Sequence, residues 1–265
     1  MEEDAEFLKS ISNYVAIAVE NSRLYEDIKA YTERLEATIL LNEKLQRVKT
    51  QLTKFVPASV ANIVEQEPEK LMGKKISMDV SVLFIDIQGF SVLIQNFDQQ
   101  LVNDMVEKHF SKYLLCVDRH GGELNETSGD GLMILFKSDT LENHARAAVA
   151  AGLEVAEENR QLNRDLFYPW NDVHLHMGIN SGKAYVGVTR MKGITGERLT
   201  YTASGLVTVI AARIGQLSEN TRLFIGPETH KMIRDGYSCD FIGDCRLKNI
   251  SERTSIFCVK DASGP

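Results

Sequence analysis

Two aspartates stand where a carboxylate site can form. Asp86 ends the apolar run DVSVLFIDI (79–87), and Asp130 lies between two glycines in ELNETSGDGLMILF (123–136). If these segments are neighbouring strands of one sheet, the two carboxylates can meet at one edge. Paired oxygen ligands suit Mg²⁺ or Mn²⁺ held jointly with substrate phosphates, and two such ions can activate an attacking oxygen and neutralise a leaving phosphate. Because aspartate is also common in turns, spacing alone leaves a structural role open.

The elements that would position these aspartates follow a mixed α/β pattern. Amphipathic stretches predict helices at 99–122, 141–163, 202–215 and 227–233. Apolar runs and turn residues predict strands at 79–87 and 222–226, hairpins over 123–136 and 173–189 (the second turning at 180–182), and a closing pair of strands over 241–259. The order β-α-β-β-α-β with appended elements is typical of an α+β, ferredoxin-like sheet with helices on one face.

The first 55 residues contain neither glycine nor proline and predict one long helix. Apolar residues recur there at steps of three and four: Phe7, Ile11, Tyr14, Ala18, Leu24, Ile28, Tyr31, Leu35, Leu41, Leu45, Val48, Leu52 and Phe55. This spacing is typical of a coiled coil, and a parallel dimer explains it more simply than a helix folded back onto the rest of the chain. Pro57 ends the helix near Val56, and a short helix is expected over 58–66.

Composition and charge narrow the class of protein. The chain has 265 residues, of which 43% are hydrophobic and 25% charged, as in ordinary soluble domains. Its net charge of -7 argues against a general nucleic-acid binder. No apolar run reaches the length of a membrane span, the acidic start MEEDAEFLKS is unlike a signal peptide, and the four cysteines form no C-x-x-C pair. We therefore expect a cytoplasmic chain, or a cytoplasmic part of a longer protein.

Several motifs in order resemble the catalytic domain of class III adenylate and guanylate cyclases. They are LFIDIQGFS (83–91), ETSGDGLMILF (126–136), MGINSGKAYVG (177–187) and LTYTASGLVTVIAARI (199–214), preceded by FVPASVANIV (55–64), which looks like the element joining signalling coiled coils to these domains. FLKSISNYVAIAVENSRLYEDI (7–28) resembles the final helix of a GAF sensor domain. The resemblance divides the chain into a GAF-like helix (1–22), a coiled coil (23–56), a connector (57–75) and the catalytic domain (76–265).

The resemblance implies an enzyme whose active sites form between two catalytic domains paired head to tail. The 3′-hydroxyl of a nucleoside triphosphate attacks its own α-phosphate, and pyrophosphate leaves. Asp86 and Asp130 would hold both divalent metal ions, with the Ile87 carbonyl as an extra ligand. The turn through Gly89, Phe90 and Ser91 would place backbone N–H groups near the phosphates, as the start of a helix can.

The partner chain would supply the remaining groups. Arg213 matches the arginine that stabilises the pentacovalent transition state, a charge contribution worth several kcal/mol in comparable sites. Lys248 in RLKNIS matches a lysine on the terminal phosphates, although an ordinary exposed lysine is an equal alternative. His174 and His176 share one face of an expected strand, and without a third ligand nearby we favour a structural role for both.

Two positions bear on the choice of base. Glu126 stands where adenylate cyclases carry a base-recognising lysine and guanylate cyclases a glutamate. A carboxylate accepts hydrogen bonds from guanine N1–H and N2–H but cannot donate to adenine N1. Thr202 stands at the second base contact, and its hydroxyl can donate or accept. GTP is therefore favoured over ATP, unless Glu126 is a solvent-facing strand residue and the base pocket is not used.

Val209 departs from the family pattern. Active members carry an asparagine there that orients the ribose, and one helical turn places positions 209 and 213 on one face. Valine cannot hydrogen-bond a sugar oxygen, and losing one orienting contact can lower the rate without abolishing metal or nucleotide binding. The alternatives are a cyclase of reduced activity, a cyclase-like domain that binds nucleotide or dimerises without turnover, and a pyrimidine triphosphate as the substrate.

Overall fold

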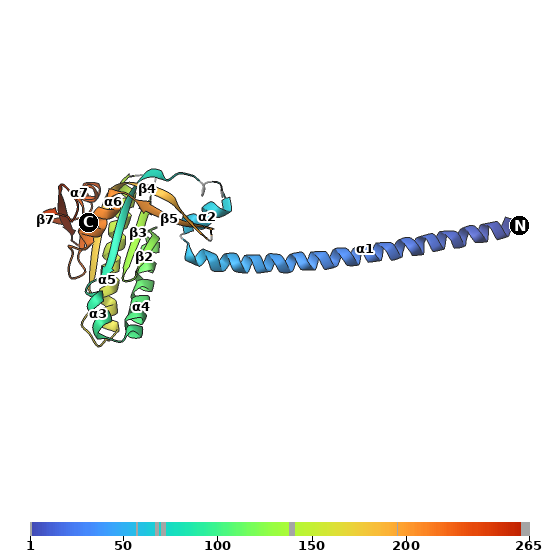
Figure 1. The fold of residues 1–265 in the computed structure, drawn as a ribbon, viewed down its shortest axis with the longest axis horizontal. Helices are drawn as coiled ribbons and strands as arrows, with labels where there is room; N and C mark the ends of the chain where they lie inside the picture. The colour runs from blue at the N-terminus through green and yellow to red at the C-terminus, as the bar shows by residue number, and fades with distance from the viewer. Residues whose placement is uncertain are drawn as a thin grey trace. The chain divides into compact units, whose positions relative to one another are not determined.

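The computed structural model describes residues 2–56, 58–66, 69, 73–137, 141–194 and 196–260. The chain divides into two compact units, Met1–Val56 and Pro57–Pro265. The first unit consists of the helix α1 (Glu2–Leu52) and a short 3-10 helix, η1 (Thr53–Phe55). Figure 1 shows α1 as one continuous helix, as its lack of glycine and proline predicts. How this helix divides between a GAF-like segment and a coiled coil stays a prediction.

The apolar side chains of α1 are exposed along its length. Leu24, Ile28, Leu35, Leu41 and Leu45 all keep about half or more of their surface accessible, between 48% and 64%. A single copy of the chain therefore leaves the predicted seam uncovered. None of the helices in the described ranges is long and apolar enough to cross a membrane.

The second unit is built on one eight-stranded sheet. Its strands are β1 (Ile76–Ile87), β2 (Glu123–Ser128), β3 (Gly131–Lys137), β4 (Leu175–Gly193), β5 (Gly196–Ser204), β6 (Leu223–Ile225), β7 (Cys239–Arg246) and β8 (Arg253–Val259). Their spatial order is β2-β3-β1-β4-β6-β8-β7, and β5 pairs with β4 off this path. The α+β, ferredoxin-like fold with appended strands is confirmed.

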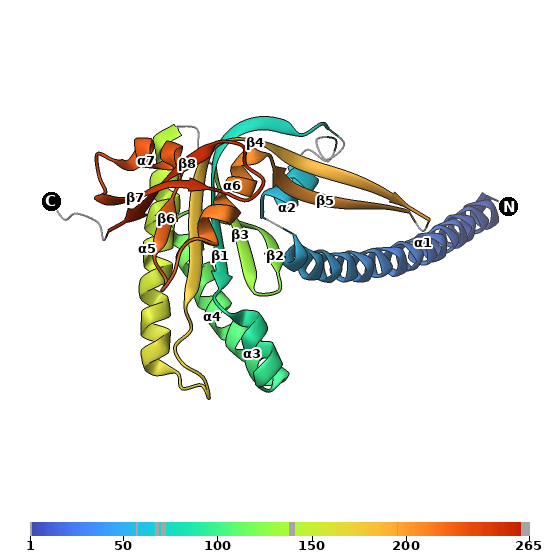
Figure 2. The ribbon, with the colours of Figure 1, turned by 60° about the vertical axis from the view of Figure 1, so that its left-hand side comes forward.

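Six helices belong to this unit in the part of the chain that the structure describes. They are α2 (Ala58–Gln66), α3 (Phe90–Asn96), α4 (Gln99–Arg119), α5 (Leu141–Asp165), α6 (Leu206–Gly215) and α7 (Pro227–Ile233). The long helices α4 and α5 pack side by side against the sheet (Figure 2). Asp98 begins α4 as its N-cap, where the carboxylate accepts a hydrogen bond from the Leu101 N–H at 3.0 Å.

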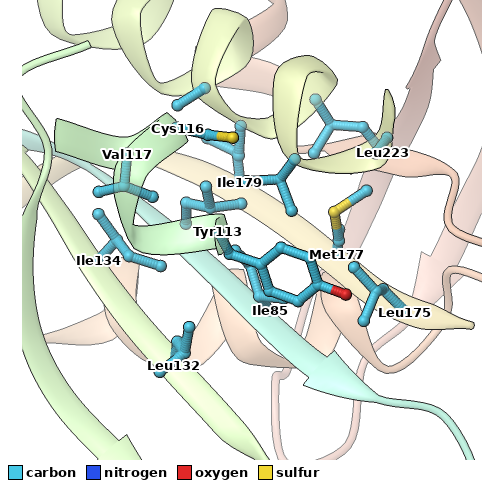
Figure 3. Close-up of a cluster of buried hydrophobic side chains, with 14 of the residues drawn as sticks. Ile85, Tyr113, Cys116, Val117, Leu132, Ile134, Leu175, Met177, Ile179 and Leu223 are labelled. Atoms are coloured by element: carbon cyan, nitrogen blue, oxygen red, sulfur yellow. The ribbon is translucent and has the colours of Figure 1, made fainter. Parts of the chain in front are cut away.

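The main core lies between the sheet and the pair α4 and α5. Tyr113 of α4, Ile85 of β1, Ile134 of β3 and Met177 of β4 are all completely buried there. Figure 3 shows these side chains pointing into one cluster. Alternation along β1 assigns this face to the odd-numbered residues, which include Ile85 and Ile87.

The opposite face of the sheet is covered by α6, which corrects the expectation that the helices lie on one face. Val80 and Val82 of β1 point to this side, where they pack with Val207 and Ala211 of α6. Asp86 follows the same alternation and faces the same side. The short α6 covers only part of this face, so the end of β1 that carries Asp86 stays open.

The expected hairpin over 173–189 is wrong, because β4 runs through this segment as one strand. Asn180 and Ser181 pair with Val82 and Ser81 of β1, and both are buried. The turn falls near Ile194, where β4 leads into β5. The expected helix over 202–215 begins only at Leu206, because the residues before it belong to β5. In both places pairing across the sheet overrides the local turn and helix signals.

Candidate active site

The structure brings the two aspartates to one edge of the sheet. Asp86 lies opposite Gly131 in the β1–β3 register, and the Ile87 N–H donates to the Asp130 carbonyl at 3.1 Å. A Cβ atom at Gly131 would lie 3.1 Å from Oδ1 of Asp86. Because residue 131 is a glycine, no side chain at this position crowds the Asp86 carboxylate beside the turn that carries Asp130.

A cavity of about 330 Å³ opens beside these carboxylates. Its walls come from the ends of β1 and β3, the β2–β3 turn, β4 and the last turn of α6. The lining residues are Phe84, Ile85, Asp86, Glu126, Ser128, Asp130, Gly131, Leu132, Met133, His176, Ala212, Gly215 and Gln216. Three of the predicted site residues, Asp86, Asp130 and Glu126, thus share one cavity.

The electrostatics of the cavity favour a cation. Burial, and secondly the negative charge of Asp130, raise the pKa of Asp86 from 3.8 to about 6, while His176 opposes this shift. The ion pairs found within the described ranges include neither aspartate. Two neighbouring carboxylates that repel each other and form no ion pair suit a divalent cation. The described residues form no cluster of three or more metal-binding side chains, so a metal ion would need further oxygen ligands.

The turn after β1 is shaped for a close approach of the backbone. Gly89 adopts φ +73°, a left-handed conformation that favours glycine. Phe90 and Ser91 then begin α3, and the backbone N–H groups of these first residues have no acceptor within the helix. The Gln88 N–H donates to the His174 carbonyl at 2.9 Å and joins this turn to the start of β4. A turn with two such N–H groups therefore lies next to Asp86, and its contact with phosphate stays a prediction.

Helix α6 rests directly on the backbone of β4. A Cβ atom at Gly178 would lie 2.2 Å from the Gly215 nitrogen, so glycine at position 178 permits this contact. The contact turns Ala212 and Gly215 toward the cavity. Arg213 and Val209 are absent from the lining of the cavity in their own chain.

Arg213 and Val209 lie one turn apart on α6, as the helical spacing predicts. Val209 is 44% exposed and has no polar atom on its side chain. Arg213 is half-buried, and its Nη1 donates to Oε1 of Gln216 at 2.7 Å. The guanidinium is therefore held beside Gln216, a residue that lines the cavity.

The remaining predicted residues occupy other places. Thr202 lies on β5, where its hydroxyl donates to Oδ1 of Asn125 at 3.1 Å. Lys248 is exposed between β7 and β8. Within a single chain neither residue contributes to the cavity around the aspartates.

Comparison with known proteins identifies the family. Residues 72–260 match the model of the adenylate and guanylate cyclase catalytic domain. The chain belongs to this family. It is 23% identical over 226 residues to the terminal-differentiation-specific adenylate cyclase of Dictyostelium discoideum, a match that covers 83% of this chain. The chain spans only 10% of the length of that protein.

Solved structures of cyclases show the same fold. The adenylyl cyclase CyaB from P. aeruginosa superposes with a TM-score of 0.64 at 25% identity, over 71% of this chain and 96% of that one. The guanylyl cyclase Cya2 superposes with a TM-score of 0.64 at 22% identity, over 72% of this chain and 96% of that one. Both an adenylyl and a guanylyl cyclase thus match this domain, and the fold does not distinguish the two bases.

Sequence reasoning did not place His176, Ser128 or Gln216 in the cavity of this cyclase domain, although it named His176 as a structural residue. His176 lies opposite Asp86 on β4, and its Nδ1 contacts the carbonyl of Ser218. Ser128 and Gln216 also line the cavity. His174 precedes β4 and does not reach the aspartate cavity, so the two histidines do not act as a pair. Only the register of β1 with β4 shows which histidine faces the site.

Proposed function

We propose that this chain is the catalytic output module of a homodimeric nucleotidyl cyclase. The module converts a purine nucleoside triphosphate to the 3′,5′-cyclic nucleotide and pyrophosphate. The observation that carries the proposal is the meeting of Asp86 and Asp130 in one cavity, unpaired and with a raised pKa of Asp86, in a chain of the cyclase family.

Asp86 and Asp130 would hold two divalent metal ions, Mg²⁺ or Mn²⁺, with the Ile87 carbonyl as a further ligand. When bound, the ions supply a lowered pKa for the attacking hydroxyl and neutralise charge on the leaving pyrophosphate. The N–H groups of Phe90 and Ser91 would bind phosphate oxygens at the start of α3. These residues position the α-phosphate for in-line attack by the 3′-hydroxyl of the same nucleotide.

Arg213 would act in the active site of the partner chain. Its absence from the lining of its own cavity supports this assignment, because a guanidinium that serves the same chain should line the carboxylate cavity. Its role would be to stabilise negative charge that develops on the α-phosphate. Lys248, exposed on its turn, would bind the terminal phosphates from the same side.

Glu126 would favour GTP over ATP. It lies in the cavity with its side chain exposed, and a carboxylate accepts from guanine N1–H and N2–H. Thr202 would make the second contact with the base. The absence of an asparagine at position 209 leaves the ribose with one orienting contact fewer, so we expect a low turnover number.

The long helix would connect this domain to a sensor. Apolar residues at coiled-coil spacing are exposed on α1, and a second copy of the helix would cover them. A parallel coiled coil would bring two catalytic domains together and carry a signal from an N-terminal GAF-like domain in a longer, cytoplasmic protein. The small share of the relatives' length that the chain spans agrees with a protein of several domains.

A product assay tests the proposed reaction. The protein is incubated with Mn²⁺ and each of GTP, ATP, CTP and UTP, and the products are separated by chromatography. We expect cyclic GMP as the main product and cyclic AMP as the lesser one. No cyclic product from any of the four nucleotides would overturn the proposal, and a cyclic pyrimidine product would correct its substrate.

A mixing experiment tests whether the site is shared between chains. Asp86→Asn and Arg213→Ala each disable both sites of a homodimer, whereas a mixed dimer retains one intact site. Random pairing of the co-expressed variants makes half of the dimers mixed, so activity should return to about a quarter of the wild-type value. The homodimer of the double variant, which carries both Asp86→Asn and Arg213→Ala, is the matched control and should have no activity. Absence of recovery would place Arg213 in the site of its own chain.

A second candidate function is nucleotide binding without turnover. The apolar, exposed Val209 favours it, because nothing else on that face of α6 replaces the missing ribose contact. In that case calorimetry should detect metal-dependent nucleotide binding while the product assay stays negative. Signalling would then depend on dimerisation alone.

A further inference from the structure

Asn125 is an amide side chain between the two proposed base-binding residues, Glu126 and Thr202. In the β2–β3 pairing Leu124 lies opposite Ile134 and Glu126 opposite Met133, so Asn125 is the extra residue of a β-bulge. Ordinary alternation would place Glu126 on the same face as Leu124, which packs beneath α4 and α5.

The bulge instead aligns Glu126 with Met133, whose side chain lies on the face that α6 covers. Asn125 reaches β5 on this same side of the sheet, where it contacts Thr202 and Ala203. One inserted residue therefore brings the amide of Asn125 and the carboxylate of Glu126 to the proposed base site together.

The hydrogen bonds of Asn125 fix the direction of its amide. The Ala203 N–H donates to Oδ1 of Asn125 at 3.2 Å. A backbone N–H can only donate, so the atom it meets must be the amide oxygen. Thr202 Oγ1 lies 3.1 Å from the same oxygen, which carries no hydrogen. The Thr202 hydroxyl is therefore the donor of this second bond.

The proton of Thr202 is thus directed into the protein. Its only other acceptor among the described residues is the Ala203 carbonyl, at 3.2 Å. Both acceptors belong to the protein, so toward a ligand Thr202 presents lone pairs. A hydroxyl in this state accepts a hydrogen bond from an amino group but cannot donate to a carbonyl oxygen.

We infer that Asn125 is a specificity-determining residue that limits the preference for guanine set by Glu126. This inference rests on the proposed cyclase function and on the base-facing role of Thr202. Glu126 matches the N1–H and N2–H groups of guanine, whereas an acceptor at Thr202 matches the C6 amino group of adenine and opposes the C6 carbonyl of guanine. The two residues therefore favour different purines.

The cost of binding guanine is the release of one hydrogen bond. To donate to the C6 carbonyl, Thr202 must turn its hydroxyl away from Asn125, whose oxygen keeps its bond to Ala203. Removing Asn125 frees the Thr202 proton in advance. Since one neutral hydrogen bond is released, the ratio of kcat/KM for GTP to that for ATP should rise about threefold to tenfold.

The amide nitrogen of Asn125 makes no hydrogen bond to the described residues, so a substitution at this position breaks only the bonds of the amide oxygen. Nδ2 is buried and has no hydrogen-bond partner in the described structure. Asn125→Leu removes this unpaired donor together with the oxygen and keeps a similar volume, so the fold should tolerate it. Asn125→Ala is the second variant, because a smaller side chain cannot clash. Circular dichroism and the melting temperature establish that each variant is folded.

The test is a double-mutant cycle with Thr202→Val, measured as the GTP-to-ATP ratio of kcat/KM. Asn125→Leu and Asn125→Ala should raise the ratio in the wild-type background. In the Thr202→Val background, which has no hydroxyl to direct, the same changes should leave the ratio unaltered. A purely structural role of Asn125 would lower activity with both nucleotides alike in both backgrounds.

Binding measurements separate this inference from the proposed function. Dissociation constants of the non-hydrolysable α,β-methylene analogues of GTP and ATP are measured by calorimetry with Mn²⁺. A shift in their ratio without any cyclic product would support the inference and overturn the proposed turnover. Cyclic product with an unchanged ratio would overturn the inference alone. Failure of both analogues to bind would overturn both.

Discussion

The two faces of the central sheet differ in how their polar groups are satisfied. On the face that α4 and α5 cover, the Tyr113 hydroxyl donates to Oδ1 of Asn159 at 2.5 Å, and Nδ2 of Asn159 donates to the Val173 carbonyl at 2.8 Å. On the face that α6 covers, the carboxylates of Asp86 and Asp130 form none of the ion pairs found among the described residues. The hydrogen bonds of Tyr113 and Asn159 are thus made within one chain, whereas the two carboxylates have no ion-pair partner among the described residues.

The difference follows from the length of the covering helices. The helices α4 and α5 have 21 and 25 residues, and α6 has 10. Long helices exclude water from a whole face, so apolar side chains are stable there. The short helix leaves the end of β1 open to a ligand or a second chain. A stable face thus lies behind a face whose two carboxylates stay unpaired among the described residues.

The largest effect should come from Asp86→Asn, which removes a carboxylate that we propose to bind metal on the open face. We expect the cyclisation rate to fall by about a thousandfold or more, because a charge-stabilising group in the transition state is lost. Asp79→Asn is the matched control on the same strand, where Asp79 pairs with Lys183 at 3.0 Å. It should leave the rate within about twofold, since exposed ion pairs contribute little. Equal effects of the two changes would contradict the assignment.

Leu83→Ala tests the opposite face on the same strand as Asp86. Leu83 is completely buried in the core beneath α4 and α5. Its truncation should lower the free energy of unfolding by about 2–5 kcal/mol, measured by urea denaturation. The folded fraction should keep its kcat/KM within about threefold at low temperature. A variant that keeps its stability but loses activity would contradict the assignment of stability to this face and of the active site to the other.

Val209→Asn should restore the missing ribose contact on α6. One added hydrogen bond in the transition state predicts a rise in kcat of about tenfold, measured as cyclic product per enzyme. Stability should change by less than about 0.5 kcal/mol, because the position is exposed. Val209→Ala is the control and should give no rise. An unchanged rate in Val209→Asn would favour the function of binding without turnover.

The smallest effect concerns stability against pH. The folded pKa of Asp86 is about 6 against an ordinary value of 3.8, so the folded chain binds more protons than the unfolded chain between these values. The contribution of protonated Asp86 to the free energy of unfolding is then fully present below about pH 3.8 and is lost as pH rises through 6. The loss should be about 1 kcal/mol, allowing for solvent screening of a half-exposed group.

Thermal unfolding at pH 4 and pH 7.5 measures this effect. Asp86→Asn should be more stable than the wild type at pH 7.5, and the difference should vanish near pH 4, where the wild-type carboxyl is protonated. Mn²⁺ should stabilise the wild type at pH 7.5 and not the variant. A metal-free wild type with the same pH dependence as Asp86→Asn would show that the raised pKa of Asp86 does not affect folding.

The sequence predicted the elements whose signals are local. Helical spacing without glycine or proline predicted the first long helix, and Pro57 marked its end. The short helix at 227–233 was predicted to the residue, since a proline begins it. The positions of Asp86 and Asp130 at strand ends allowed their carboxylates to meet, and the resemblance to cyclases predicted that they do. The roles of Arg213, Lys248, Glu126 and Val209 stay predictions.

Only the tertiary structure decided which side chains face each other across the sheet. Asn180 and Gly182 signal a turn locally, yet twelve pairs with β1 hold this segment as the middle of one long strand. His176 became a neighbour of Asp86, and Asn125 a partner of Thr202, through strand pairing and a bulge. Local propensity reports on neighbours within a few residues. Register depends on contacts between segments far apart in the chain, and one shifted residue reverses which face a side chain occupies.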